Sequence, residues 1–205
     1  MYAHMYQSSR GGHTGNGSDP AGVGTEAPSQ PDLVGSITFR QLAGAGEACL
    51  TLWDTDASAA AFLRGHTGPA ALSAEIYEVT ATVAGSAAAQ PPAYARLMYF
   101  DGPRAPEIAA AADRAGRERI WPAISGLNGL VGVYVLRSSD LGAVVVTLAT
   151  SVETLDAAAR AAMSTELMPG EDPALLPGPD RIEIHHVTGY HLPAASRRPA
   201  ERKPT

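Results

Sequence analysis

The chain has 205 residues, 45% hydrophobic and 18% charged, with a formal net charge of −6 at pH 7. This apolar content excludes a wholly disordered chain. The acidic balance, with Lys203 as the single lysine, argues against a nucleic-acid partner, because phosphate binding needs clustered basic residues. The lone Cys49 excludes an internal disulfide and a cysteine metal cluster. No apolar run approaches the ~20 residues of a membrane helix, and MYAHMYQSSR lacks a signal-peptide pattern, so we expect a soluble cytoplasmic protein without a membrane partner.

The first half of the chain predicts strands and one helix. YAHMYQS from Tyr2 is the first strand, LVGSITFR from Leu33 the second, and EIYEVT from Glu75 the last. Between them, Asp56 to Arg64 has the spacing of an amphipathic helix, with Asp56 as its N-cap. Residues 10–32 are rich in Gly, Ser and Pro, so we expect a flexible segment where a first helix would stand.

The second half follows a flexible linker over residues 85–92 and predicts a complete set of elements. In chain order these are a strand Tyr94 to Phe100, a helix from Pro106 to Trp121, strands Val131 to Arg137 and Val144 to Ala149 joined by the hairpin 138–142, a helix Glu153 to Met163, a loop Met168 to Pro179 without a secondary-structure pattern, and a strand Arg181 to Tyr190. Residues 193–205 form a polar, basic tail that we expect to be disordered.

The two halves match at three places in the same order. LVGSITFR aligns with LVGVYVLR from Leu130, EIYEVT aligns with EIHHVT from Glu183, and YAHMYQS aligns with YARLMYF from Tyr94. Collinear matches of this kind indicate an internal duplication. We therefore predict an α+β chain built from two tandem β-α-β-β-α-β repeats, over residues 1–84 and 93–192, with the first repeat lacking its first helix.

The segment GLVGVYVLRSSDLGAVVVTLATSVETLDAA resembles the antibiotic biosynthesis monooxygenase-like domains, in which a Gly-led strand ends in Arg and is followed by a hairpin and a helix. LTLWDTDASAAAFL of the first half is similar, with Trp53 at the family's usual Trp position, where the second half has Ala149. The resemblance implies a ferredoxin-like dimeric α+β barrel, with both of its sheets supplied here by one chain. It also implies cofactor-free oxidation of a phenolic, anthrone-type substrate by molecular oxygen.

Candidate site residues lie mainly in the second half. Trp121 and Asn128 are at and just after the end of its first helix, a region that faces the pocket in such folds, and are candidate catalytic residues. Tyr99, Tyr134 and Trp53 are candidates for substrate binding. Each has a structural alternative: Trp121 can pack the helix end, Asn128 can make a turn with Gly129, and the tyrosines can be ordinary strand residues.

His185 and His186 replace Tyr77 and Glu78 of the first half, so the shared fold does not require them. Adjacent strand residues point to opposite faces, so the pair cannot chelate one metal, and at most one faces the pocket. Glu183 has the same parity as His185, which favours His185 as a catalytic base and leaves His186 as a substrate-binding candidate.

Other histidines are lesser candidates: His4 in the first strand and His191 at a strand end. No metal-ligand spacing is visible, and we expect no cofactor. Haem degradation is disfavoured, since the resemblance implies an Asn in the first strand, which is absent, and a His on the second helix, where only His66 follows.

These features predict a cofactor-independent monooxygenase acting on an aromatic, polyketide-like substrate. Two alternatives use the same pocket: a non-catalytic protein that binds a small molecule or a protein partner, and a cyclase or isomerase that needs no oxygen. A pocket of several hundred cubic ångströms shared by Trp121, Asn128 and a histidine would favour an enzyme, and a plugged pocket would favour a binding protein.

A homodimer is a further expectation. Strands of the first half carry Ile37, Phe39, Leu50, Leu52 and Ile76, which would make both faces of the sheet apolar, while one helix covers the outer face. A ligand, the segment from Ala70 to Leu72 or a second chain could cover the remainder, and we favour a second chain.

Overall fold

The computed structural model describes residues 1–9, 32–66 and 73–192, in which eight antiparallel strands form a closed barrel in the order β1-β3-β2-β8-β5-β7-β6-β4. The strands are β1 (Tyr2–Ser9), β2 (Leu33–Gln41), β3 (Gly46–Trp53), β4 (Ser73–Ala84), β5 (Tyr94–Phe100), β6 (Leu130–Arg137), β7 (Ala143–Ala149) and β8 (Arg181–His191). The predicted strands of the second half are correct to within one residue at each end. The predicted flexible segment 10–32 (apart from its last residue) and the tail 193–205 lie outside the described residues.

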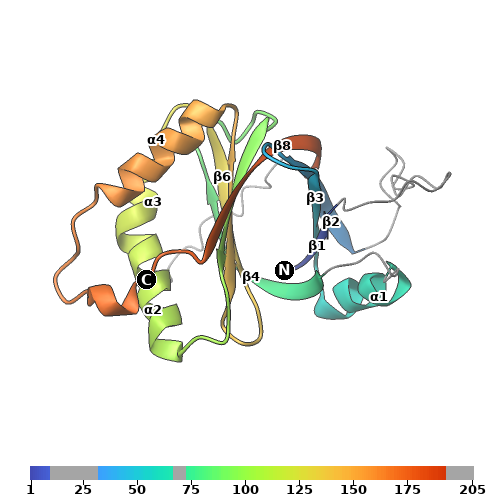
Figure 1. Ribbon diagram of the computed structural model, residues 1–205, viewed down its shortest axis with the longest axis horizontal. Helices are drawn as coiled ribbons and strands as arrows, with labels where there is room; N and C mark the ends of the chain where they lie inside the picture. The colour runs from blue at the N-terminus through green and yellow to red at the C-terminus, as the bar shows by residue number, and fades with distance from the viewer. Residues whose placement is uncertain (10–31, 67–72, 193–205) are drawn as a thin grey trace, which may run out of the picture.

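Helices cover the barrel from outside, on opposite sides (Figure 1). One side carries α1 (Asp56–His66), and the other carries α2 (Pro106–Ala115), α3 (Trp121–Ile124) and α4 (Val152–Met163). A π-helical turn over Gly116–Ile120 joins α2 to α3, so the predicted helix from Pro106 to Trp121 is continuous but bulged. The loop Met168 to Pro179 contains a short 3₁₀ turn, Pro173–Leu175, because the Asp172 side chain caps the backbone N–H of Ala174. The prediction of no secondary structure there was wrong.

The two halves of the chain have the same strand order, β4-β1-β3-β2 and β8-β5-β7-β6, and their outer strands pair β2 with β8 and β4 with β6. The registers correspond as well: Tyr2 lies opposite Glu78 in the first half, and Tyr94 lies opposite His186 in the second. Each half therefore has the strand order of a ferredoxin-like unit, and the barrel is a ferredoxin-like α+β barrel. Descent of the halves from one repeat remains a prediction.

Glycine at the seam between β2 and β8 lets the two backbones approach closely. A Cβ added at Gly35 would lie 2.5 Å from the carbonyl oxygen of His191 and 2.3 Å from Leu192 Cδ2. Gly132 holds the aligned position in β6, and a Cβ there would lie 3.0 Å from the carbonyl oxygen of Val83 at the end of β4. Residue size at these positions therefore limits how the halves join.

The barrel interior holds the main core, and this changes the argument for a homodimer. Ile37, Phe39, Leu50 and Leu52 are at most 1% exposed and pack together inside the barrel. Of the five apolar residues expected on both faces, these four share the inward parity, and the outer-facing positions of β2 include Thr38 and Arg40, which pair with Cys49 and Glu47. The outer face is thus more polar than expected. The apolar outer surface that was the reason for expecting a homodimer is therefore not there.

The linker 85–92 between the halves is described in the structure and packs against β6. The N–H of Gly85 donates to Val131 O at 3.0 Å, and the N–H of Ala87 donates to Leu130 O at 2.8 Å. The Ala87 side chain is buried. The expected flexible linker is therefore a tight turn that continues the seam between β4 and β6.

Helix α1 is capped one residue earlier than the sequence suggested. The N–H of Ser58 donates to Thr55 Oγ1 at 3.2 Å, whereas Asp56 is the acidic residue of the first turn. We expect Thr55→Ala to lower the free energy of unfolding by about 1 kcal/mol, measured by urea denaturation, and Asp56→Ala to have the smaller effect. A larger loss of unfolding free energy for Asp56→Ala than for Thr55→Ala would show that Asp56 is the cap.

Candidate functional site

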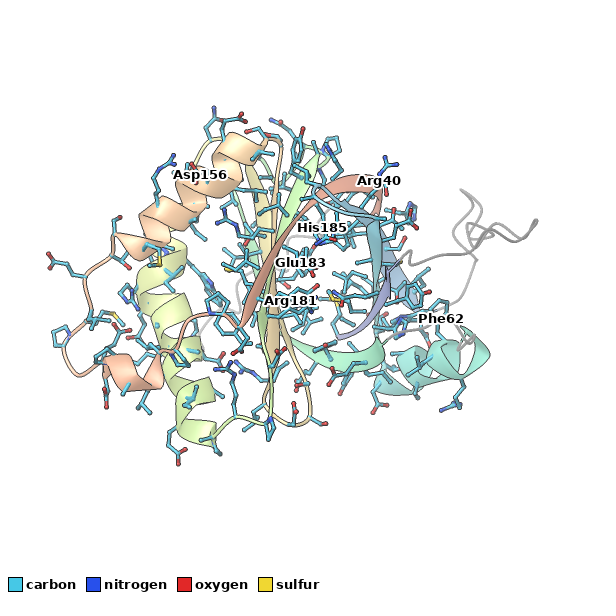
Figure 2. The ribbon with its side chains drawn as sticks, viewed as in Figure 1. Arg40, Phe62, Asp156, Arg181, Glu183 and His185 are labelled. Carbon is cyan, nitrogen blue, oxygen red and sulfur yellow. The ribbon has the colours of Figure 1, made fainter. Side chains whose placement is uncertain are left out.

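A row of polar side chains lies on the inner face of β8, beginning at the end of the barrel with the half-exposed Arg181. Arg181, Glu183 and His185 alternate along the strand and so share its inner face (Figure 2). His185 is 2% exposed, and its Nε2 lies 3.1 Å from Glu183 Oε2. Arg181 Nη1 donates to Glu183 Oε1 at 2.5 Å. The carboxylate of Glu183 therefore bridges a guanidinium and an imidazole inside the barrel.

Tyr99 of β5 extends this network across the barrel. Its hydroxyl donates to Glu183 Oε2 at 3.2 Å, and the Gln7 side-chain amide of β1 donates to the same hydroxyl. The Arg181 guanidinium lies 3.8 Å from the centre of the Tyr99 ring. Burial, followed by the charge of Glu183, raises the pKa of Tyr99 far above its ordinary value. Tyr99 is therefore a neutral hydrogen-bond donor to the carboxylate.

The first half carries a simpler version of the same arrangement. Tyr77 aligns with His185 and Glu75 aligns with Glu183, and the Tyr77 hydroxyl donates to Glu75 Oε2 at 2.9 Å. Burial and the hydrogen bond to Glu75 raise the pKa of Tyr77, which is thereby kept neutral. The second half therefore has an imidazole where the first has a phenol.

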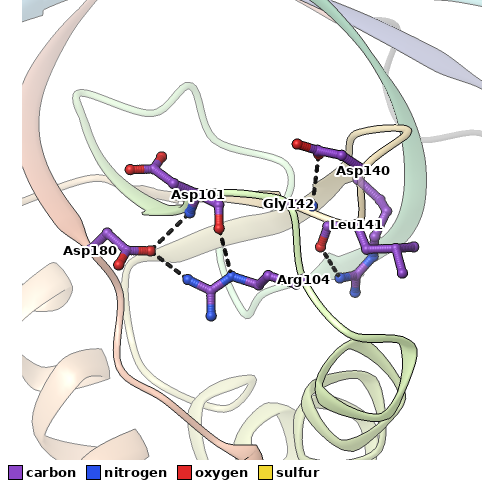
Figure 3. Close-up of polar contacts among 7 residues, drawn as sticks. Asp101, Arg104, Asp140, Leu141, Gly142 and Asp180 are labelled. Carbon is purple, nitrogen blue, oxygen red and sulfur yellow. Dashed lines mark hydrogen bonds and ion pairs between the residues drawn. The ribbon is translucent and has the colours of Figure 1, made fainter.

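A small polar cavity of about 70 Å³ opens at the end of the barrel beside Tyr77 and Tyr99. At roughly 30 Å³ per water molecule, it has room for about two waters and none for an aromatic ring. Its rim is fixed by polar contacts (Figure 3): the N–H groups of Asp101 and Gly142 donate to Asp180 Oδ2 at 2.9 Å and to Asp140 Oδ1 at 3.1 Å. Arg104 pairs with Asp180 and donates from Nε to the Asp101 carbonyl at 2.9 Å. These contacts hold the loops at the barrel end in place.

A larger cavity of about 290 Å³ lies at the other end, where β4 ends and β6 begins. Most of its lining is apolar, and its hydroxyl groups come from Thr82, Tyr134 and Tyr190; the lining residues are Thr82, Val83, Ala84, Ala88, Ala89, Gln90, Pro91, Val131, Gly132, Tyr134, Leu148, Tyr190 and Leu192. Burial, followed by proximity to Tyr190, raises the pKa of Tyr134 to about 12. Burial also raises the pKa of Tyr190. This cavity has the size and lining of a site for a small aromatic molecule.

Three of the predicted site residues face the barrel interior. His185 and Tyr99 belong to the polar network, and Tyr134 lines the larger cavity. They come from β8, β5 and β6 respectively.

Trp121 and Asn128 are placed elsewhere, in the helical layer outside the barrel. The Trp121 ring packs at 3.4 Å from where a Cβ of Gly116 would stand, and the Asn128 side chain is exposed while its carbonyl accepts from Thr154 Oγ1 at 3.1 Å. Gly129 has φ of 84°, as an Asn-Gly turn requires. Trp121, Asn128 and His185 line neither of the two cavities, so the structure does not bring the three to one pocket.

His186 and Trp53 also point outward. His186 is exposed and its ring centre lies 4.9 Å from that of Tyr94. Trp53 is 1% exposed, donates from Nε1 to Thr51 Oγ1 at 3.0 Å, and packs against Phe62 of α1 with ring centres 5.1 Å apart. These contacts attach α1 to the barrel.

Several residues of the polar network and of the larger cavity were not among the predicted site residues, including Gln7, Arg181, Glu183 and Tyr190. Arg181 and Glu183 could have been found from their shared parity with His185, and Glu183 also from its match to Glu75. Gln7 aligns with Tyr99, but a glutamine facing a tyrosine across a barrel leaves no pattern in the sequence. The bulge near the end of β8 hides the inward direction of Tyr190, because it breaks the alternation of the strand.

Among the described residues, no helix is long and apolar enough to cross a membrane. Within the same ranges, no three His, Cys, Asp or Glu side chains are grouped so that they could hold a metal ion.

The sequence matches no protein-family profile and no curated protein, whereas solved structures match in fold. An anthrone oxidase-like protein aligns over 92% of both chains with a TM-score of 0.59 at 14% identity. A protein from Fusobacterium nucleatum named as a monooxygenase aligns over 93% of this chain and 94% of its own, with a TM-score of 0.64 at 6% identity. A heme-degrading enzyme from Listeria monocytogenes aligns over 94% and 100%, with a TM-score of 0.50 at 10% identity.

Each of these alignments covers more than nine-tenths of this chain, so the likeness extends over the whole barrel rather than over one half. At such low identities the likeness concerns the fold. The chain has the ferredoxin-like α+β barrel fold of the antibiotic-biosynthesis-monooxygenase-like proteins, and the resemblance of fold predicted from the sequence is confirmed.

Proposed function

We propose that the chain is a cofactor-independent monooxygenase that holds a hydroxylated aromatic, polyketide-like molecule in the 290 Å³ cavity. The observation that carries the proposal is the cavity itself, whose apolar walls are joined by the neutral hydroxyls of Tyr134 and Tyr190. Apolar walls favour an aromatic body, and the hydroxyls can orient its oxygen atoms. Neighbours of the same fold named as an anthrone oxidase-like protein and a monooxygenase support this choice of chemistry.

The reaction needs no metal if the substrate can become an electron-rich anion. The enol or phenol O–H loses its proton, and the anion passes one electron to O₂. The resulting radical and superoxide combine at carbon, and the peroxide takes up the proton. Loss of water, carrying the second hydrogen of the substrate CH₂ group, leaves a carbonyl, so CH₂ and O₂ give C=O and H₂O. A dry cavity with fixed hydroxyl donors stabilises the anion without reorganisation of solvent.

Among the sequence candidates, His185 is the one proposed as the base, because it is a buried imidazole on the inner face of the barrel. Trp121 and Asn128 lie outside the barrel, and catalytic roles for them have no support from the geometry. A substrate contact is proposed for Tyr134, whereas Tyr99 lines the small cavity at the opposite end of the barrel and is not proposed to contact the substrate.

A specific observation favours a second candidate function, a binding protein without catalysis. The lining of the larger cavity contains no carboxylate, imidazole or ammonium group, so a ligand there meets only neutral side chains. A cyclase or isomerase would use the same cavity without consuming oxygen. Measuring ligand binding and oxygen uptake on the same preparation separates these functions.

We expect chelator-treated protein to consume oxygen when given an anthrone, followed with an oxygen electrode. Tyr134→Phe should lower the rate about tenfold, because it removes one donor to the developing oxyanion. Tyr94→Phe, a tyrosine on the outer face of β5, is the matched control and should keep the rate. Tight anthrone binding without oxygen uptake would instead show that the chain is a binding protein without catalysis.

We further propose that the halves arose by duplication, which their common strand order and registers support. A cytoplasmic location and association into a homodimer stay predictions.

A further inference from the structure

Two tyrosines from different strands of the barrel meet at the larger cavity. Tyr190 of β8 lies opposite Ile37 of β2. Tyr134 of β6 lies opposite Val146 of β7. Ile37 and Val146 are buried in the barrel core, and residues opposite one another in neighbouring strands share a face, so both phenols point inward. Strands β5 and β7 stand between β8 and β6, so the phenols enter the cavity from different directions.

Neither of these hydroxyls has a hydrogen-bond partner among the residues that the structure describes, although both line the same cavity. Proximity to Tyr190 contributes to the raised pKa of Tyr134, so the phenols are close enough to interact although they do not bond each other. Burial raises the pKa of both, which keeps them protonated at neutral pH. Two neutral O–H donors without a protein acceptor leave a place between them for an atom that accepts from both.

The first half lacks both phenols at the equivalent positions. LVGSITFR has Ile37 where LVGVYVLR has Tyr134, and the match of EIYEVT with EIHHVT, continued by two residues, puts Thr82 where β8 has Tyr190. The strand registers agree, because β4 and β8 each carry a bulge just before these positions. The fold that the halves share therefore does not require a phenol at either place, which favours a role in ligand binding over a role in packing.

We infer that Tyr134 and Tyr190 donate hydrogen bonds together to a single oxygen atom of the ligand, the enol or phenol oxygen that ionises. The inference rests on the proposed function and adds Tyr190 as a second catalytic residue. It also defines the substrate class, a ring compound whose ionisable oxygen lies between the two phenols while its apolar body packs on Val131 and Leu148. Two donors that are in place before the charge develops stabilise the oxyanion without reorganisation.

A probe with one oxygen tests the inference, because both tyrosines must then act on the same atom. 2-Naphthol absorbs at longer wavelength when it is ionised, so absorbance under argon, with protein in excess, gives the pH at which the bound probe loses its proton to the buffer. We expect Tyr134→Phe and Tyr190→Phe each to raise this midpoint by about one pH unit, a tenfold loss of preference for the anion. The double variant should raise it by about two units. The control Tyr94→Phe, on the outer face of β5, should keep the wild-type midpoint.

The variants should fold like the wild type, because neither hydroxyl has a partner to lose among the described residues, and urea denaturation checks this. A raised midpoint in only one of the two single variants overturns the inference and leaves the proposed function standing with one donor. An unmoved midpoint in both, with naphthol still bound, also overturns it, since the hydroxyls then bond only water. Failure of the wild-type chain to bind naphthol overturns the proposed function and the inference together.

Discussion

Replacing Gly35 with alanine is expected to lower the free energy of unfolding by about 3 kcal/mol. The added Cβ would stand 2.5 Å from the carbonyl oxygen of His191, a backbone atom that cannot turn away, and 2.3 Å from Leu192 Cδ2. Relief requires the pairing of β2 with β8 to open, and this pairing is one of the two seams between the halves. Leu192 also lines the larger cavity, so affinity for an aromatic ligand should fall with stability.

Urea denaturation of Gly35→Ala and Gly126→Ala checks this prediction. A Cβ at Gly126 would meet no atom within 4 Å, so this substitution controls for the general effect of replacing glycine. Equal midpoints for the two variants would show that the seam accommodates a methyl group, contrary to the prediction.

The second large effect is expected at Arg119, in the π-helical turn. Its Nε lies 3.0 Å from Glu171 Oε2, with side chains only 13% and 4% exposed, and its Nη1 donates to Thr165 Oγ1 at 2.6 Å. Arg119→Met leaves the carboxylate of Glu171 buried without its cation. We expect a loss of about 3 kcal/mol in the free energy of unfolding, because an unpaired buried charge is strongly unfavourable.

The double variant Arg119→Met with Glu171→Met supplies the control. It removes both charges and keeps apolar volume, so it should recover most of the loss, as replacements of whole buried ion pairs often do. Glu171 Oε2 also accepts the N–H of Met168 at 2.8 Å, so a part of the loss should persist. Additive losses in the double variant would contradict a coupling between the two side chains.

The strands could be predicted from the sequence because they are rich in residues that favour β-structure, and because EIYEVT and EIHHVT support one another. The sequence does not show which strands pair or in which register, so it could not show which face of each strand points into the barrel. We therefore predicted apolar residues on both faces of the first-half sheet. The structure instead packs four of them inside the barrel: Ile37, Phe39, Leu50 and Leu52. Helix α2 was found from its spacing, but its bulge at Gly116–Ile120 was not, since a π-turn adds one residue without a distinct composition.

The site could be predicted only where strand parity defined it. His185 and Tyr99 were predicted as site residues on strands, with Glu183 as a neighbour of matching parity, and the structure places all three in one polar network, while their functional roles stay predictions. Trp121 and Asn128 were chosen by their place after a helix, a criterion that does not say which side of the sheet the helix covers. The polar network around Glu183 depends on contacts between distant residues, such as Tyr99 with Gln7 at a separation of 92 and with Glu183 at 84, and such contacts leave no local signal.

Each of the eight strands that the structure describes is paired on both sides in the closed barrel, and this has a consequence for the chain while it is being made. The first half emerges before β6 and β8 exist, so until they arrive the exposed backbones of β2 and β4 are templates for pairing with other chains. Joining β2 to β8 brings Ser36 opposite His191, and such distant pairings form slowly. The period of greatest risk of aggregation therefore falls between synthesis of the first four strands and arrival of the last, and slower translation of the second half would lengthen it.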